Sequence, residues 1–361
     1  MGSLQKFMRP ELGKFAGYAA CKSPEVLTEE VRRLGVVKLD ANENVYGPSP
    51  AVTRALGQLN DVHIYPDSCQ TELRKALAQY AGVPSENIVA GSGSDQLIDL
   101  LVRMFVSPDD EVITFTPTFA MYKFFTDLAG GKFIAVPRDN DYQVVLDRLP
   151  EVVSDRTKLI FIAMPNNPTG TQVPLETVYT LLQTGLPVVV DEAYYEFTGQ
   201  TLADKLDQYP NLIILRTFSK WAGLAGLRIG YGLFPDEVAR KLDAIKDPYC
   251  VNAAAVTAAR ASLNDLDYLM DKVKLIIQER ERLFQALQGV YYLKPFPSAA
   301  NFILCRVEGK NGAEIQSRLE QRGILVRYFN SPNMENSLRF SIGKPHDTDR
   351  LLTELLKIGE A

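Results

Sequence analysis

The chain is poor in histidine and cysteine, and both shortages exclude kinds of site. Its 361 residues include only two histidines, His63 and His346, so a histidine-rich metal site is excluded. A Ser-His-Asp hydrolase would need one of these two, and neither is supported by a Gly-x-Ser-x-Gly turn. The few cysteines form no Cys-x-x-Cys motif, which favours free thiols in a reduced compartment. They are Cys21, Cys69, Cys250 and Cys305.

Long apolar runs and an excess of positive charge are also missing. No run reaches the roughly 20 residues that a membrane span needs, and residues 1–14 lack the apolar core of a secretory signal. A net charge of −5 indicates neither a nucleic acid nor an anionic membrane as partner. A hydrophobic content of 46% is enough for a large core, in one large domain or two. We therefore expect a cytoplasmic globular protein.

From about residue 70 to 245, strand-like and helix-like runs alternate, which predicts a mostly parallel sheet wrapped by helices. A long helical stretch ends the alternation, and a smaller α+β domain is predicted after it. We divide the chain into an arm (1–45), a large domain (46–245) and a small domain (246–361). The expected strands are 88–90, 111–115, 158–164, 188–191, 212–217, 228–233, 302–305, 324–327 and 338–341. The expected helices include 266–287, 312–321 and 346–358.

Lys220 stands out because small and apolar residues surround it between Thr217 and Arg228. A lysine there is poorly placed as a surface charge. A desolvated amine is instead suited to bond an aldehyde carbon, as lysines do with pyridoxal phosphate. The hydroxyl of Ser219 and the guanidinium of Arg228 would suit a phosphate group near the same amine. The alternative is a glycine-bearing loop with a structural lysine.

Two further segments place polar side chains where buried strands end. Asn166 and Asn167 follow the strand 158–164 in a turn rich in proline, and ligands in open α/β sheets lie beyond such strand ends. Ordinary turn chemistry is the alternative for either residue alone. Asp191 ends an apolar strand, so its carboxylate needs a partner. A protonated pyridine nitrogen is one such partner, and a helix cap or a salt bridge is the other.

Three motifs in this order resemble the fold-type I aminotransferases that use pyridoxal phosphate. They are Asn-Asn-Pro-Thr-Gly at 166–170, Asp-Glu-Ala-Tyr at 191–194 and Thr-Phe-Ser-Lys at 217–220 with a trailing arginine. The resemblance extends from the loop 42–44 to Arg339 and is strongest to the histidinol-phosphate aminotransferases. It implies an α/β large domain with a mostly parallel seven-stranded sheet, plus a smaller C-terminal α+β domain. The pointers to the subgroup are residues 39–44, 65–67, 298–302 and 338–343.

The resemblance implies roles around the cofactor ring. Lys220 is implied to be the catalytic residue that bonds pyridoxal phosphate, and Asp191 to support the pyridine nitrogen. Phe119 matches the aromatic residue that stacks on the ring, where relatives often carry tyrosine. Asn167 and Tyr194 match the residues that bind the ring's phenolic oxygen. No metal is implied.

The resemblance also implies a phosphate cup. Ser94 and Asp95 lie in Gly-Ser-Gly-Ser-Asp between a strand and a helix, where free backbone N–H groups favour an anion. Ser219 and Arg228 would complete the cup. Tyr65 matches a tyrosine that reaches across a dimer interface to the partner's cofactor phosphate. The expected working unit is therefore a homodimer with shared active sites.

The resemblance implies that Arg339 binds the substrate carboxylate, as an arginine does throughout this family. Arg327 and Tyr18 match residues typical of the histidinol-phosphate subgroup. Histidinol phosphate carries a phosphate and glutamate carries two carboxylates, and the planar fork of arginine suits either anion. We expect transamination between histidinol phosphate and 2-oxoglutarate in histidine biosynthesis, giving imidazole-acetol phosphate and glutamate. Val45 and Gly17 stand where many relatives have proline, and 94–96 also depart from the usual pattern.

Three alternatives stay open on the sequence. An aromatic amino acid aminotransferase, or a decarboxylase of threonine phosphate, would use the same lysine, aspartate and arginine set. A binding protein on the same scaffold is the third alternative. The joint presence of Lys220, Asp191, Asn167 and Arg228 argues against it, because binding alone does not need all four.

Overall fold

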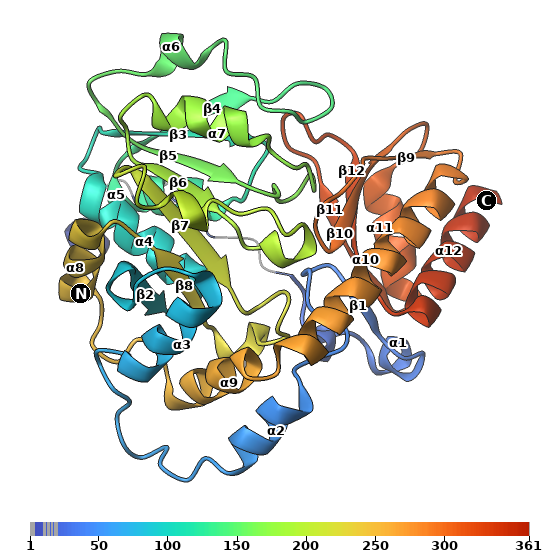
Figure 1. The fold of residues 1–361 in the computed structure, drawn as a ribbon. Coiled ribbons are helices and arrows are strands. Elements are labelled where there is room, and N and C mark those ends of the chain that lie inside the picture. The colour runs from blue at the N-terminus through green and yellow to red at the C-terminus, as the bar shows by residue number, and fades with distance from the viewer. Residues whose placement is uncertain (1–3, 10–11, 13–14, 16, 18–20, 361) are drawn as a thin grey trace.

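Two β-sheets with their covering helices make up the molecule, a computed structural model that describes residues 4–9, 12, 15, 17 and 21–360 (Figure 1). The larger sheet has the strand order β2-β8-β7-β6-β5-β3-β4. Neighbours from β7 to β4 are parallel, and β8 is antiparallel to both β2 and β7. The strands are β2 (Ile88–Gly91), β3 (Glu111–Thr116), β4 (Lys132–Pro137), β5 (Thr157–Ala163), β6 (Val188–Asp191), β7 (Leu212–Thr217) and β8 (Gly230–Leu233).

This sheet confirms the predicted fold class and its six expected strands, with two differences. The strand expected from residue 228 begins at Gly230, because Arg228 has a left-handed φ of 52° that no strand residue adopts. The sequence analysis missed β4, an edge strand whose short apolar run lies between Lys132 and Pro137. Such a short run next to proline does not distinguish a strand from a loop.

Helices cover both faces of the large sheet, so its central strands β5, β6 and β7 are buried on both sides. Successive residues of β6 alternate between two cores: Val188 and Val190 belong to one, and Val189 to the other. That double burial explains the continuous apolar runs in the sequence. The helices of this part are α2 (Pro50–Gly57), α3 (Thr71–Ala81), α4 (Gly93–Phe105), α5 (Met121–Ala129), α6 (Leu149–Val152), α7 (Leu175–Leu182), α8 (Asp236–Ile245) and α9 (Ala253–Leu263).

The smaller sheet has the order β1-β11-β12-β10-β9, and α10, α11 and α12 pack on one side of it (Figure 1). Its edge strand β1 comes from the first 45 residues and pairs in parallel with β11. Part of the predicted arm therefore belongs to this sheet, although the domain boundaries at 45 and 245 stay predictions. The elements are α1 (Glu29–Arg33), β1 (Val37–Leu39), α10 (Leu266–Gln288), β9 (Leu293–Pro295), β10 (Phe302–Val307), α11 (Gly312–Gln321), β11 (Ile324–Phe329), β12 (Ser337–Ser341) and α12 (Pro345–Glu360).

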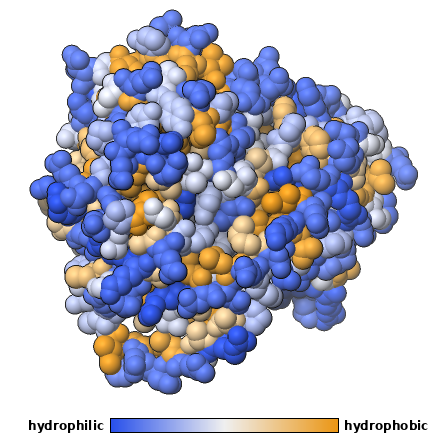
Figure 2. All heavy atoms as spheres, in the orientation of Figure 1, coloured by the Kyte–Doolittle hydropathy of each residue, from blue (hydrophilic) through white to orange (hydrophobic). Residues whose placement is uncertain are grey.

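Short 3-10 helices complete the described chain. They are η1 (Leu4–Phe7), η3 (Pro24–Val26), η4 (Ser85–Asn87), η5 (Tyr195–Phe197), η6 (Ala203–Lys205) and η7 (Ala225–Leu227). None of the helices in the described residues has the length and apolar character needed to cross a bilayer. The face seen in Figure 2 is hydrophilic over most of its area, with separate apolar patches.

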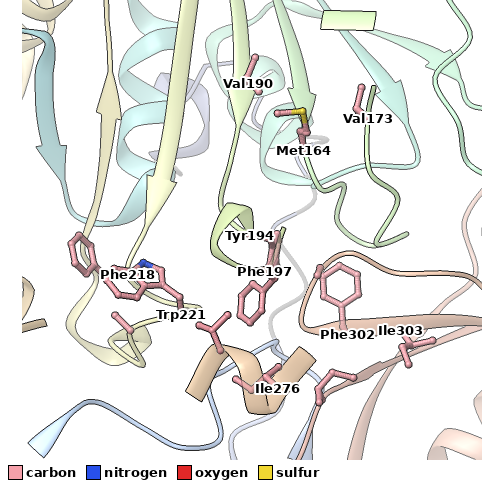
Figure 3. Close-up of a cluster of buried hydrophobic side chains, with 14 of the residues drawn as sticks. Met164, Val173, Val190, Tyr194, Phe197, Phe218, Trp221, Ile276, Phe302 and Ile303 are labelled. Carbon is pink, nitrogen blue, oxygen red and sulfur yellow. The ribbon is translucent and has the colours of Figure 1, made fainter. Parts of the chain in front are cut away.

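One hydrophobic cluster joins the two sheets beneath the loops that follow β6 and β7 (Figure 3). Phe218 and Trp221 come from the loop after β7, and Ile276 of α10 lies in the same cluster. The ring of Tyr194, after β6, meets Phe302 of β10 edge to face at 5.3 Å between centroids. These contacts fix the loop that carries Lys220, because the apolar residues on both sides of that lysine are buried.

Candidate active site

A cavity of about 270 Å³ lies beyond the carboxyl ends of β5, β6 and β7 and is closed on one side by β12. This is the position where open α/β sheets bind ligands. Both sheets contribute to its wall. The predicted site residues that line it are Ser94, Asp95, Phe119, Asn167, Asp191, Tyr194, Ser219, Lys220, Arg228 and Arg339. The other lining residues are Cys21, Ala41, Asn42, Glu43, Ala163, Pro165, Ala193, Thr217 and Ala225.

Two of the residues predicted for the site do not line this cavity, and a third lies outside the described residues. Tyr65 is 76% exposed, and its ring stacks on that of Tyr249 at 4.4 Å between centroids. Arg327 is half-buried on β11, and its Nη1 donates to the Sγ of Cys21 over 3.8 Å. Tyr18 lies outside the described residues. The roles implied for these three side chains therefore stay predictions.

The amine of Lys220 contacts the loop that follows β1. Its Nζ donates to the backbone oxygen of Ala41 over 3.0 Å. Burial, and after it the nearby charge of Arg339, lowers the pKa of Lys220 to about 8. Both effects disfavour the ammonium form. A substantial fraction of this amine is therefore neutral and nucleophilic near neutral pH.

Asp191 ends β6 as a buried carboxylate with two hydrogen bonds. The hydroxyl of Tyr122 donates to its Oδ2 over 2.6 Å, and the backbone N–H of Ala193 donates to its Oδ1 over 3.0 Å. Burial raises the pKa of Asp191 to about 6, against the opposing effect of these two hydrogen bonds. No lysine or arginine among the described residues forms an ion pair with it. The position therefore suits a cationic ligand group.

Tyr122 is a site residue that the sequence analysis missed. It lies on α5 behind Phe119, whose ring it meets edge to face at 5.7 Å, and it stacks on Phe161 at 4.7 Å. Nothing in the sequence around Met121 marks its hydroxyl as different from that of any core tyrosine. The only available signal was its place three residues after Phe119, one helical turn away.

Arg339 joins the two halves of the site. It is buried on β12, and its Nη1 donates to the Oδ1 of Asn167 over 2.6 Å. Its Nη2 donates to the backbone oxygen of Asp40 over 2.7 Å. The guanidinium from the small sheet is thus held against the loop after β5, where it lines the cavity.

Asn42 is a second residue whose contacts the sequence analysis did not predict. Its backbone has a left-handed φ of 56°, which asparagine tolerates better than most residues. Its Nδ2 donates to the hydroxyl of Tyr194 over 3.0 Å. Ser341 donates to its Oδ1, and Asn301 donates to its backbone oxygen, each over 2.9 Å. The loop 42–44 contributes to the family resemblance, but its sequence does not predict these hydrogen bonds of Asn42.

The residues predicted to form a phosphate cup lie at the amino end of α4. Gly93 has a φ of 77°, which places Ser94 and Asp95 in the first turn with backbone N–H groups that no preceding helical residue can bind. The Nη2 of Arg228 donates to the Oδ2 of Asp95 over 2.8 Å. A Cβ added at Gly230 would lie 2.4 Å from the backbone nitrogen of Ser94. Glycine is therefore required for the strand to approach this turn so closely.

A separate charged network lies behind the site. Glu192 and Arg216 form a buried ion pair at 2.9 Å, on the ends of neighbouring strands β6 and β7. The Nη2 of Arg216 also donates to Thr201 over 2.6 Å. The described residues contain no group of three or more histidine, cysteine or acidic side chains placed to bind a metal ion. This network is therefore interpreted as structural.

The chain is similar in sequence to known proteins of one family. A model of the family described as aminotransferase class I and II matches residues 35–355. Histidinol-phosphate aminotransferase of Dehalococcoides mccartyi (strain CBDB1) is 54% identical over 358 residues, covering 99% of each chain. The chloroplastic histidinol-phosphate aminotransferase of Nicotiana tabacum is 44% identical, covering 96% of this chain and 85% of its own length.

The fold comparison leads to the same group. The crystal structure of histidinol-phosphate aminotransferase from Sinorhizobium meliloti in complex with pyridoxal-5'-phosphate has a TM-score of 0.87 at 30% identity. It covers 98% of this chain and 97% of its own. By sequence and by structure alike, the chain belongs to the class I and II aminotransferases, within the histidinol-phosphate aminotransferase family.

Proposed function

We propose that this protein transfers an amino group between histidinol phosphate and 2-oxoglutarate, giving imidazole-acetol phosphate and glutamate, as a step of histidine biosynthesis. The observation that carries the proposal is the convergence of Lys220, Asp191 and Arg339 on one cavity. These three side chains supply a neutral amine, a buried carboxylate and a cationic fork for an anion. The family relatives named above carry the same activity in their names.

The cavity fits pyridoxal phosphate. The carboxylate of Asp191 is buried without a cationic partner among the described residues, so it suits a protonated pyridine nitrogen. Phe119 would cover a face of the ring. The N–H groups at the start of α4, with Ser219 and Arg228, would hold the phosphate. When bound, this cofactor supplies a cationic ring that withdraws electrons from the substrate carbon.

Lys220 is the residue proposed to move the proton. Its pKa of about 8 leaves part of the amine neutral at physiological pH, so it can accept a proton from a substrate carbon. The resulting ammonium can then return the proton. Burial of the surrounding loop excludes water that would compete for it.

Arg339 is proposed to bind the anionic group of each substrate in turn. The bidentate fork suits both the phosphate of histidinol phosphate and a carboxylate of glutamate. Asn167 and the backbone oxygen of Asp40 already fix its orientation, which lowers the entropy lost when a substrate binds. Arg327 and Tyr18 are proposed to assist at the same end of the cavity.

A substrate panel tests this function. The purified protein with pyridoxal phosphate is mixed with 2-oxoglutarate and histidinol phosphate, phenylalanine, tyrosine or threonine phosphate, and glutamate and carbon dioxide are measured. We expect the highest kcat/KM for histidinol phosphate, with glutamate formed. A higher value for phenylalanine or tyrosine would instead assign an aromatic aminotransferase. Release of carbon dioxide from threonine phosphate would assign a decarboxylase, and turnover by no substrate a binding protein.

We also propose that the working unit is a homodimer and that Tyr65 completes the partner's phosphate cup. The exposure of Tyr65 supports this, since Val62 and Ile64 on the same loop are exposed as well. The test mixes two inactive or impaired variants, K220A and Y65A. A hybrid dimer with one intact site should regain activity, whereas activity equal to that of the separate variants would contradict shared sites.

A cytoplasmic location also stays a prediction.

A further inference from the structure

Asn42 connects a hydroxyl of the small sheet to a hydroxyl of the active site. Its Oδ1 lies 2.9 Å from Oγ of Ser341 on β12, and its Nδ2 lies 3.0 Å from the hydroxyl oxygen of Tyr194, which follows β6. All three residues are buried, and Asn42 and Tyr194 line the cavity. The side-chain amide of Asn42 is therefore held by polar contacts at both its oxygen and its nitrogen.

The backbone N–H of Asn42 fixes the way in which this amide is turned. That N–H donates to Oγ of Ser341 over 2.9 Å, so Oγ accepts there and donates its one proton elsewhere. Oδ1 of Asn42 is the acceptor that the described residues offer to this proton. An amide turned the other way would present a second donor to Oγ and leave a buried O–H without an acceptor, which costs free energy.

The same orientation decides what the hydroxyl of Tyr194 does. Because Oδ1 of Asn42 faces Ser341, Nδ2 donates to the oxygen of Tyr194, and that hydroxyl keeps its own proton for donation. An amide turned the other way would accept the proton through Oδ1. The ring of Tyr194 is also held by its edge-to-face contact with Phe302 (Figure 3). Asn42 therefore controls the direction of the hydrogen bond at Tyr194 rather than the place of its ring.

We propose that Asn42 is a positioning residue, which sets the hydroxyl of Tyr194 as a donor to the phenolic oxygen of pyridoxal phosphate. This inference deepens the proposed function and rests on it for the role of Tyr194. A hydrogen bond donated to the phenolic oxygen stabilises its deprotonated, charged form. The hydrogen bond from Nδ2 of Asn42 polarises the O–H of Tyr194 and so strengthens that donation.

A pH titration of the visible band of the bound cofactor tests this role. Asn42→Asp keeps the side-chain shape and tolerates the left-handed φ of 56°, but its carboxylate only accepts and so takes the proton of Tyr194. We expect Asn42→Asp and Tyr194→Phe each to raise the midpoint by about one pH unit, as for loss of a hydrogen bond to a charged oxygen. The double variant should show the rise of one substitution only, because both act on the same hydrogen bond.

Asn44→Asp is the matched control for the added negative charge. Asn44 is buried in the same loop and does not line the cavity, and its Nδ2 donates to the backbone oxygen of Trp221 over 2.7 Å. We expect its midpoint to equal that of the native protein. Additive rises in the double variant would overturn the proposal, because the aspartate at position 42 would then act through its charge alone. A native midpoint for Asn42→Asp would overturn it as well.

Ser341→Ala gives a second test that adds no charge. Loss of this hydroxyl lets the amide of Asn42 turn in part of the molecules, so we expect a smaller rise of the midpoint, absent when Tyr194→Phe is added. Ser337→Ala is the matched control, since that buried hydroxyl on β12 donates to the backbone oxygen of Glu335 over 3.1 Å. Equal midpoints for both variants would contradict the inference. The titrations use no substrate, so their outcome is independent of the substrate panel that tests the proposed function.

Discussion

The hydroxyl of Tyr122 donates a 2.6 Å hydrogen bond to Oδ2 of Asp191, and both side chains are buried. Burial raises the pKa of the carboxyl, and this hydrogen bond is the largest opposing effect. Tyr122 is itself held by the stack on Phe161. The tyrosine therefore fixes the orientation of the carboxylate and favours its charged form, the form that a protonated pyridine nitrogen needs.

Removal of this hydroxyl should weaken cofactor binding. For Tyr122→Phe we expect a rise of about tenfold in the Kd for pyridoxal phosphate, as for a hydrogen bond to a charged group. The measurement is a fluorescence titration of the apo protein. Tyr292→Phe is the matched control, because that buried hydroxyl donates to the backbone oxygen of Leu355 on α12, away from the cavity. Equal Kd values for Tyr122→Phe and native protein would show that Tyr122 only fills space.

The buried, charged carboxylate of Asp191 should lower the unfolding free energy of the apo protein at neutral pH. Its pKa of about 6 in the folded chain exceeds the usual value of 3.8, so the folded state binds the proton more tightly. The stabilisation that comes from proton binding by Asp191 is complete below pH 3.8 and is lost as the pH rises through about 6. We expect Asp191→Asn to raise the unfolding free energy at pH 8 by up to about 3 kcal/mol while it weakens cofactor binding.

Urea unfolding of the apo protein checks this expectation. The measurements run from about pH 4 to about pH 8, so that they span the titration of Asp191. Asp271→Asn is the control, because Asp271 is exposed and pairs only with neighbouring Lys274 on α10. The explanation would fail if Asp191→Asn kept the native pH dependence of stability.

Lys220 should capture the cofactor in a pH-dependent manner. Because its pKa is lowered to about 8, its neutral fraction grows as pH rises through that value. We expect the rate of cofactor attachment to the apo protein to rise with the same midpoint. Lys220→Ala should lose the cofactor's visible band and at least about 1000-fold in turnover. Stopped-flow absorbance checks the midpoint, and Lys274→Ala is an exposed control. A midpoint near that of a free lysine would contradict a desolvated amine.

Gly230 should be required for phosphate binding. A Cβ at this position would lie 2.4 Å from the backbone nitrogen of Ser94, so the first turn of α4 would have to move. We expect Gly230→Ala to raise the Kd for pyridoxal phosphate about tenfold or more through this displacement. Gly226→Ala is a matched control near the same site, since a Cβ there meets no atom within 4 Å. Calorimetric titration would reject the explanation if both variants bound alike.

Much of the site could be predicted from local sequence. Asp191 and Asn167 follow buried parallel strands, and such strands end at one edge of a sheet. Lys220 lies in a segment whose small and apolar residues already indicated burial. The order of these motifs therefore predicts that several polar side chains share one site.

Other features depended on contacts between distant segments. The strand β1 has only three residues, too few for a periodic pattern, and its partner β11 lies almost 300 positions later. The bridge from Cys21 to Arg327 spans 306 positions. From the sequence, Tyr122 cannot be distinguished from an ordinary core tyrosine, because its carboxylate partner Asp191 lies on another element.

The amino-acid sequence by itself determined the two-sheet α/β fold, the strand ends that carry Lys220 and Asp191, and the family. Only the tertiary structure decided that Tyr122 orients Asp191, and that the thiol of Cys21 contacts Arg327. The physical reason is that hydrophobic periodicity reports which face of an element is buried. The partner of a buried polar atom depends instead on how elements far apart in the chain pack together.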